Sequence, residues 1–289
     1  MENTLHYNEM VTKLRAFFQK KEYIEVPASY RTSIMAGCED PRTINTYFLG
    51  GLKFPLPQTG QMWLEVELLK NPSWKGVYCL GPSFRDEPNP IPGRHVRLFP
   101  MFDFEGRGDF SDLQEIEVEL VTYLGFKAPI NLNYEDLCSR YGVTILEHTE
   151  EERMSKEIST SISLEKYPLR TDPFWNMKHV GNGIFNKIDV ILHGMETIGS
   201  AERSCNKEEM RTYFHSIVDG KYAQLFFDHF GKERVMNELN QYLDLNFFPR
   251  FGGGIGIMRL EAAMIKEALF ENSTSYIPAA AHVFKQPTI

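Results

Sequence analysis

The chain has 289 residues, of which 42% are hydrophobic and 24% are charged, and its formal net charge is −8. A chain of this length can bury a sizeable core, and the composition excludes disordered and collagen-like proteins. The acidic balance argues against a broad, non-specific grip on nucleic acid, although it leaves room for a local basic site.

The first elements predicted along the chain are a helix and a short strand. Apolar residues at positions 10, 11, 14, 17 and 18 share one helical face, and the predicted helix ends near Lys21. The segment Tyr23-Ile24-Glu25-Val26-Pro27 is typical of a strand, and its proline belongs at an edge, a strand end or an interface because it cannot donate to a sheet. A further strand is predicted over 77–81.

The segment 98–105 predicts a strand with two different faces. Alternation places Leu98, Pro100, Phe102 and Phe104 on one face. The other face then carries Phe99, Met101, Asp103 and Glu105. One face therefore belongs to a core, and the other presents acids.

The middle of the chain predicts a helix, an insertion and a hairpin. The helix covers 112–124, with Ser111 or Asp112 as its N-cap, and the polar stretch from about 127 to 166 is expected to form an inserted lobe of short helices. Segments 188–192 and 195–198 flank a two-residue turn, His193-Gly194, typical of a hairpin. Asp189 and Glu196 would then face one surface, where two carboxylates and phosphate oxygens suit Mg²⁺; the alternative is a pair of acids on a solvated face.

Helices between strands without strict βαβ alternation predict an α/β (α+β) fold, with a mainly antiparallel sheet flanked by helices, as one domain over 1–289. The four cysteines, at 38, 79, 138 and 205, have no CxxC spacing, so reduced thiols are expected rather than a zinc site or a disulfide framework. The start does not resemble a secretory signal, and no apolar run is long enough to span a membrane. We therefore expect a cytoplasmic protein.

Two segments carry chemistry that suits a phosphate ligand. Arg85, in Phe84-Arg85-Asp86-Glu87, follows a strand and offers a planar fork of donors for a phosphate or carboxylate. Near the end of the chain, the run 252–256 is rich in glycine and lets the backbone approach a ligand, with Arg259 close behind. Each pattern alone is also compatible with a surface ion pair or a structural turn.

Together these segments resemble the three signature motifs of class II aminoacyl-tRNA synthetases, in the same order. The segment KKEYIEVP resembles motif 1, GPSFRDEPNPIPGRHVRLFPMFDFE resembles motif 2, and FGGGIGIMRLEAAM resembles motif 3. Within the class, TGQMWLE (59–65), VYCLGPSFRDE (77–87) and METIGSAERS (195–204) are similar to the aspartyl and asparaginyl branch. The segment 59–65 is expected to be a strand of the substrate pocket.

The resemblance implies roles for matching positions. Arg85, Arg259 and Glu196 would be catalytic, with Phe99 stacked on adenine. The residues implied around ATP are Arg85, Glu87, Arg94, His95, Phe99 and Arg259. The residues implied around the amino acid are Glu39, Asp40, Gln61, Trp63, Glu65 and Arg203. The residues implied around Mg²⁺ are Asp189, Glu196 and Ser200.

Three positions depart from the family pattern. Leu64 stands where aspartate-specific members have a lysine that binds the substrate carboxylate, and Leu98 replaces a glutamate before the stacking phenylalanine. Gly199 stands where some members have a serine that contacts Mg²⁺, with Ser200 as a substitute. An altered amino acid, an altered nucleotide contact and lost activity all remain open.

The resemblance implies an ATP-dependent, AMP-forming ligase that adenylates an aspartate- or asparagine-like amino acid. Motif 1 begins within the first 30 residues, which leaves no room for the anticodon-binding barrel of full-length members. The sequence therefore also resembles ammonia-dependent and archaeal asparagine synthetases, which transfer the acyl group to ammonia without tRNA. The alternatives are a truncated synthetase that acylates tRNA or another acceptor, and a silent paralogue that binds an amino acid or nucleotide. Motif 1 further implies a homodimer.

Overall fold

The computed structural model describes residues 3–27, 40–91 and 94–270. The strands are β1 Tyr23–Glu25, β2 Thr46–Leu49, β3 Leu52–Pro55, β4 Gly76–Phe84, β5 Leu98–Arg107, β6 Ile130–Asn133, β7 Ser161–Pro168, β8 Ile184–Leu192, β9 Met195–Glu202 and β10 Arg250–Gly256. The α-helices are α1 Thr4–Lys20, α2 Gln61–Lys70, α3 Phe110–Tyr123, α4 Tyr134–Tyr141, α5 His148–Glu157, α6 Lys207–Ser216, α7 Lys221–Phe230, α8 Lys232–Leu243 and α9 Ile257–Lys266. Short 3₁₀ turns occupy Pro41–Thr43, Leu169–Thr171 and Ile217–Gly220.

Eight strands form one sheet in the order β1-β4-β5-β10-β9-β8-β7-β6, and β2 and β3 form a separate hairpin. Only the outermost pairs of the large sheet, β1 with β4 and β6 with β7, are parallel. The predicted mainly antiparallel sheet is therefore confirmed. None of the helices in the described ranges is long and apolar enough to span a bilayer. Cys79, Cys138 and Cys205 are free thiols, as expected.

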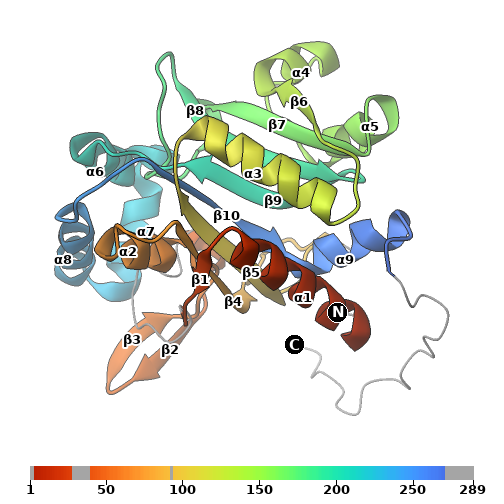
Figure 1. The fold of residues 1–289 in the computed structure, drawn as a ribbon. Helices are drawn as coiled ribbons and strands as arrows, with labels where there is room; N and C mark the ends of the chain where they lie inside the picture. The colour runs from red at the N-terminus through yellow and green to blue at the C-terminus, as the bar shows by residue number, and fades with distance from the viewer. Residues whose placement is uncertain (1–2, 28–39, 92–93, 271–289) are drawn as a thin grey trace.

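One face of the sheet is covered by α1, α3 and α9, which lie across it side by side in Figure 1. Their apolar stripes and the inward residues of the central strands, among them Phe102 and Phe104, form the largest hydrophobic cluster. Burial of this kind contributes roughly 25 cal/mol per Å² of apolar surface. The prediction for β5 is confirmed at Phe102 and Phe104, which are fully buried on the core face while Asp103 and Glu105 lie on the other, but not at Leu98, which is exposed.

A second hydrophobic cluster lies at the other side of the sheet. It joins α6, α7 and α8 to Met62 on α2 and to Trp175, which is fully buried. On the opposite face of the sheet, a cavity is lined by residues of α2, α7, β8 and β9. This cavity is part of the candidate site.

Two local predictions are wrong. Residues 59–65 are not a strand, because α2 begins at Gln61 and buries residues 61, 62, 64, 65, 68 and 69 at helical spacing. The helix starts where Asp103 accepts hydrogen bonds from Thr59 Oγ1 (2.7 Å) and from the Gly60 amide (2.9 Å). The N-cap of α3 is Asp109 rather than Ser111 or Asp112, since Asp109 and Asp112 form a reciprocal capping box.

The segment 127–166 contains the expected short helices α4 and α5, and it also extends the main sheet. Its strand β6 and most of β7 continue the sheet beyond β8, and α4 packs against β7. The parallel pairing of Ile130 with Ile162 and of Leu132 with Leu164 ties the segment to the sheet. In the described residues the segment is thus part of the same sheet rather than an all-helical lobe.

Candidate functional site

The floor of the site is a trough of small residues across four strands. Register places Glu105, Gly252, Ala201 and Lys187 in one row across β5, β10, β9 and β8. The neighbouring row contains Asp103, Gly254, Gly199 and Asp189. Charged side chains on β5 and β8 thus form the two walls of the trough. Between them, β10 and β9 present only glycine and alanine, which leaves space above the sheet. A Cβ on Gly254 would lie 2.9 Å from Asp103 Oδ1, so a larger residue there would displace the wall.

Two cavities of about 470 and 210 Å³ lie over this trough. They meet at Gln61, Glu196 and Gly199, which line both. The larger cavity contains Arg203 and Asp40, and the smaller contains Arg85, Phe99 and Arg259. The residues predicted for the amino acid and for ATP therefore fall largely into two adjoining spaces.

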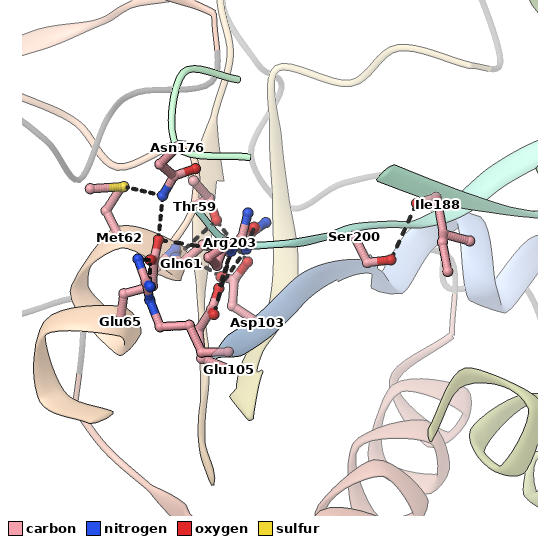
Figure 2. Close-up of polar contacts among 12 residues, drawn as sticks. Thr59, Gln61, Met62, Glu65, Asp103, Glu105, Asn176, Ile188, Ser200 and Arg203 are labelled. Atoms are coloured by element: carbon pink, nitrogen blue, oxygen red, sulfur yellow. Dashed lines mark hydrogen bonds and ion pairs between the residues drawn. The ribbon is translucent and has the colours of Figure 1, made fainter. Parts of the chain in front are cut away.

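Arg203 dominates the polar end of the larger cavity. Its Nε donates to Glu105 Oε1 at 3.1 Å, and its Nη2 donates to Glu105 Oε1 at 2.5 Å and to Gln61 Oε1 at 2.6 Å (Figure 2). The pKa of Glu105 is raised to about 8. Burial is the main cause and Glu65 adds to it, whereas Arg203 acts in the opposite direction. A second carboxylate, Glu65, lies 3.8 Å from Arg203 Nε. This end therefore offers both hydrogen-bond donors and acceptors.

Glu65 is fully buried and held from three sides. It accepts from Asn176 Nδ2 (2.6 Å), Tyr242 Oη (2.8 Å) and Arg250 Nε (2.9 Å), and Arg250 is itself fully buried. Glu65 borders the larger cavity, as predicted, but these contacts already occupy its carboxylate. Its carboxylate is therefore held in place, since a buried charge is costly to release from its partners.

Trp63 and Leu64, both placed in the substrate pocket from the sequence, point elsewhere. Because residues 61–70 are helical, Trp63 lies on the opposite side of α2 from Gln61 and Glu65, whereas Leu64 is turned only partly away from them. Leu64 is fully buried in a small cluster with Val26, Leu68, Val77 and Cys79, and Trp63 packs against that cluster. Trp63 is absent from the described lining of both cavities, which does not favour its predicted role in substrate binding. Leu64 likewise borders neither cavity among the residues described.

Asp40 and Glu39 were assigned to the substrate amino group. Asp40 borders the larger cavity, and its carboxylate accepts two hydrogen bonds of 2.9 Å from the guanidinium of Arg42. The backbone there is fixed by Gln58, whose amide exchanges hydrogen bonds with Asp40 N and O. Glu39 lies outside the described residues.

The smaller cavity gathers all six residues predicted around ATP, namely Arg85, Glu87, Arg94, His95, Phe99 and Arg259. The Arg85 guanidinium carbon lies 5.7 Å from the centre of the Phe99 ring. Arg259, at the start of α9, donates to the backbone oxygen of Glu196 at 2.9 Å. Burial lowers the pKa of His95, as do the nearby arginines, while Glu87 opposes this effect. Leu98 is exposed and is absent from the described lining of both cavities.

Sequence reasoning missed Glu151, on α5. Its carboxylate accepts from Arg94 and from the amide of Glu196, the latter at 3.1 Å. Arg94 also donates to the oxygen of Gly194 in the hairpin turn, at 3.4 Å. Glu151 therefore links three segments that are distant in sequence, and no local pattern in 127–166 indicates this contact.

The hairpin of β8 and β9 forms as predicted, with Gly194 and His193 both at positive φ in the turn. Asp189 and Glu196 both border the larger cavity, which confirms that they face one surface. Tyr167 and Lys187 donate to Asp189 Oδ2, each at 2.5 Å, whereas Asp189 Oδ1 is buried and has no hydrogen-bond partner among the described residues. Burial raises the pKa of Asp189 to about 7, against the lowering effect of Lys187.

Glu196 behaves differently from its neighbour. Burial favours its neutral form, but the positive charges of Arg259, Lys187 and Arg85 outweigh this and lower its pKa. Lys187, also missed from the sequence, lies with Asp189 on the trough side of β8, and its Nζ is 3.8 Å from the centre of the Tyr167 ring. The two acids therefore share one fixed ammonium group.

Ser200 borders the larger cavity, but its hydroxyl points away from Asp189 and Glu196, which does not favour its predicted role as a metal ligand. Successive side chains on β9 alternate between faces, and the Ser200 hydroxyl is on the face opposite Gly199. It donates to Glu117 Oε1 on α3 at 2.5 Å and to the Ile188 oxygen at 3.2 Å, apart from the Arg203 cluster (Figure 2). Gly199 instead opens the space between the acids, where a Cβ would lie 2.9 Å from Glu196 Oε1 and 3.6 Å from Asp189 Oδ1.

The residues present fit Mg²⁺. Asp189 has a buried oxygen without a partner, Glu196 is held ionised, and Gly199 keeps the space between them open. No group of three or more potential ligands occurs among the described His, Cys, Asp and Glu residues. Two protein carboxylates are nevertheless enough for Mg²⁺ when substrate phosphates and water complete its shell.

Comparisons with known proteins were made for the whole chain. The model of the family described as tRNA synthetases class II (D, K and N) matches residues 1–273. Over 118 residues the chain is 30% identical to an asparagine–tRNA ligase from Pelotomaculum thermopropionicum, a match covering 40% of this chain and 26% of that protein. The matched region is thus a minor part of that relative.

Solved structures with the same fold include three from this group of synthetases. Asparaginyl-tRNA synthetase from Pyrococcus horikoshii, complexed with asparaginyl-adenylate, has a TM-score of 0.75 and 18% identity, covering 90% of this chain and 64% of its own. Asparaginyl-tRNA synthetase from Entamoeba histolytica has a TM-score of 0.72 and 17% identity, and the match covers 91% of this chain and 64% of that protein. Aspartyl-tRNA synthetase from Entamoeba histolytica has a TM-score of 0.66 and 16% identity, and the match covers 89% of this chain and 54% of that protein.

Proposed function

The chain belongs to the class II tRNA synthetases of the D, K and N group, and from this premise we propose that it adenylates an amino acid with a small amide side chain, with asparagine as the first candidate. The observation that carries the proposal is the Arg203 cluster. A neutral amide can accept from Arg203 through its oxygen and donate to Gln61 or Glu105 through its nitrogen.

The same cluster disfavours a free aspartate. Glu65 opposes the charge of Arg203, Glu105 does so as well once it ionises above a pKa of about 8, and the fully buried Leu64 supplies no second cation. The side-chain carboxylate of aspartate would add a further negative charge beside these buried acids. An asparagine-like substrate would therefore be activated at its α-carboxylate, which lies toward the junction of the two cavities when the side chain contacts Arg203.

In the proposed reaction the substrate carboxylate attacks the α-phosphorus of ATP, and pyrophosphate leaves. Arg85 binds the α-phosphate and Arg259 binds the distal phosphates, so their positive charges stabilise the negative charge that develops on the phosphates in the transition state. Phe99 stacks on the adenine ring and fixes the nucleotide in the smaller cavity. Asp189 and Glu196 would hold Mg²⁺, which supplies charge neutralisation and Lewis acidity at the phosphates.

We further propose that the acyl group goes to ammonia or a small amine without tRNA. The described residues lining the larger cavity include four basic and five acidic side chains, a balance that favours a cationic or neutral acceptor over a polyanion. Acylation of tRNA is the second candidate, and the identity with an asparagine–tRNA ligase supports it. The resemblance to asparagine synthetases stays a prediction.

Product analysis decides between these acceptors. The chain would be incubated with ATP, Mg²⁺ and asparagine, alone, with ammonium and with total tRNA, and products would be identified by mass spectrometry. We expect AMP and pyrophosphate to form, and an amide of asparagine to accumulate with ammonium. Acylated tRNA without any amide would replace the first acceptor by the second, and no AMP under any condition would overturn the proposed activity.

A further inference from the structure

The larger cavity extends beyond the amino-acid end into an apolar lobe. The lobe is lined by Met62, Phe174, Ile217, Val218, Tyr222 and Leu225. These residues come from α2, from the segment after the 3₁₀ turn Leu169–Thr171, from the 3₁₀ turn Ile217–Gly220 and from α7. Most of them belong to or pack against the second hydrophobic cluster, so the wall is firm. The function proposed above leaves this lobe without an occupant.

The wall of the lobe contains an unusual backbone. Val218 has φ 51° and ψ 43°, and Asp219 follows with φ 53° and ψ 37°. A β-branched residue in the left-handed region is a genuine outlier, because its side chain crowds the backbone. The Val218 amide donates to Asp172 Oδ1 at 3.4 Å, which helps to hold this conformation. Strain of this kind concentrates at binding and catalytic sites.

An acceptor has few other ways to reach the acyl carbon. At the polar end the cavity is bordered by Glu65, which is fully buried and ion-paired with the equally buried Arg250. At the junction with the smaller cavity the nucleotide would occupy the space beside Arg85 and Arg259. Among the residues that the structure describes, the apolar lobe is a further side of the larger cavity along which an acceptor can lie. A molecule that attacks the adenylate would therefore lie along this wall.

The charges at this side of the cavity suit an amine. Asp40 and Asp172 border it. Asp40 is ion-paired with Arg42, and Asp172 accepts a hydrogen bond from the Val218 amide. Lys221 is also there, so the side has mixed charge rather than the excess of cations that a nucleic-acid phosphate backbone needs. An ammonium group can pass these acids, and an apolar body can remain against the lobe.

We propose that the apolar lobe binds the hydrocarbon body of the acceptor, which is a primary amine with an aliphatic or aromatic group. This inference rests on the proposed adenylation. The ammonium form loses a proton to solvent, the nitrogen lone pair of the free amine attacks the acyl carbon of the adenylate to form a C–N bond, and the nitrogen then loses a second proton to solvent. The bond from that carbon to the phosphate oxygen breaks, and AMP leaves with the electron pair. The product is a secondary amide.

The test compares amines of increasing apolar surface. Wild-type chain would be given ATP, asparagine and ammonium, ethylamine, butylamine or phenethylamine, with amide formation followed by mass spectrometry. Each methylene buried in the lobe should raise kcat/KM about fourfold. Pyrophosphate exchange, which needs no acceptor, would be measured in parallel. Amide formation that is fastest with ammonium, or acylation of tRNA alone, would overturn the inference while exchange persists; absence of exchange would overturn the proposed function with it.

Variants locate the acceptor within the structure. Leu225→Glu should raise KM for phenethylamine at least tenfold and remove the preference over ammonium, because a charge would then face the apolar body. Leu225→Met should restore the preference. Ile130→Glu, on the exposed strand β6, is the surface control and should change neither value. If Leu225→Glu keeps the full preference for apolar amines, the lobe is not the acceptor site.

Discussion

Glu105 determines how the site treats a carboxylate. Its pKa is raised by burial and by Glu65, to about 8, so Glu105 is increasingly ionised as the pH rises through that value. Below it the carboxyl is neutral and leaves the charge of Arg203 less opposed, which lets aspartate bind. Above it the ionised Glu105 repels aspartate but still accepts from an amide.

The preference for asparagine over aspartate should therefore increase with pH. We expect the ratio of their kcat/KM values in pyrophosphate exchange to rise between pH 6.5 and 9. Glu105→Gln, which stays neutral, should give a flat and lower ratio. A ratio that falls with pH in the wild-type chain would contradict the role given to Glu105.

Lys187 is a second single residue whose charge should affect function, here at the proposed metal site. Its Nζ neutralises part of the charge of Asp189 and Glu196, so free Mg²⁺ should bind weakly until ATP supplies phosphate oxygens. Lys187→Met should tighten binding of Mn²⁺, used as a spectroscopic substitute, by about tenfold in the absence of ATP. Titration followed by electron paramagnetic resonance measures this directly.

A matched control for this titration is Lys178→Met. Lys178 pairs with Glu202 and is 44% exposed, so its loss removes a nearby positive charge without touching Asp189. Its Mn²⁺ affinity should equal that of the wild-type chain. Equal affinities in all three proteins would show that Lys187 has no influence on the acids.

At the scale of the element, strand β9 separates two neighbouring residues into different roles. Gly199→Ala should lower adenylation at least tenfold, because its Cβ would come within 2.9 Å of Glu196 Oε1 and displace a metal-binding carboxylate. Ser200→Ala should retain activity within about threefold. It should instead lower the free energy of unfolding by about 1 kcal/mol, because the Ser200 hydrogen bond to Glu117 is lost.

Kinetics and chemical denaturation of both variants check this division. Each measurement is made on the same preparation, so a folding defect is separated from a catalytic one. The opposite result, an inactive Ser200→Ala and an active Gly199→Ala, would restore the serine as a metal ligand and reject the geometry of β9.

How far the sequence predicts an element depends on how local its determinants are. The alternation along β5 and the His193-Gly194 turn follow from neighbouring residues, and both were predicted correctly. The helix α2 was mistaken for a strand because its start depends on Asp103, which lies 43 residues from Gly60 in sequence. The sequence also could not show where the side chains of Trp63 and Ser200 point, since each depends on the face that its element presents.

The contacts of Lys187 and Glu151 also lay beyond sequence reasoning. Lys187 lines the trough only because β8 pairs with β9, and Glu151 reaches Arg94 across 57 residues of chain. Nothing in the residues around either position distinguishes it from a surface charge. The gathering of Arg85, Phe99 and Arg259, by contrast, followed from recognised motifs and was found in one cavity.

At the scale of the whole molecule, the motif 1 segment predicts a homodimer. The strand β1 lies at one end of the large sheet, and Ile24 is exposed there. An apolar side chain on an outer strand suits a second copy of the chain better than it suits water. Sedimentation at micromolar concentration should give about twice the chain mass of 33.5 kDa. A single species at the chain mass would contradict the prediction.

The central claim is that this cavity adenylates an amino acid with an amide side chain. Pyrophosphate exchange into ATP, dependent on asparagine and measured without any acceptor, tests it most directly. We expect exchange with asparagine in the wild-type chain and in Lys266→Ala, an exposed basic position on α9, and a loss of about 100-fold or more in Arg259→Ala. Exchange that is absent with asparagine, or that survives in Arg259→Ala, would contradict it.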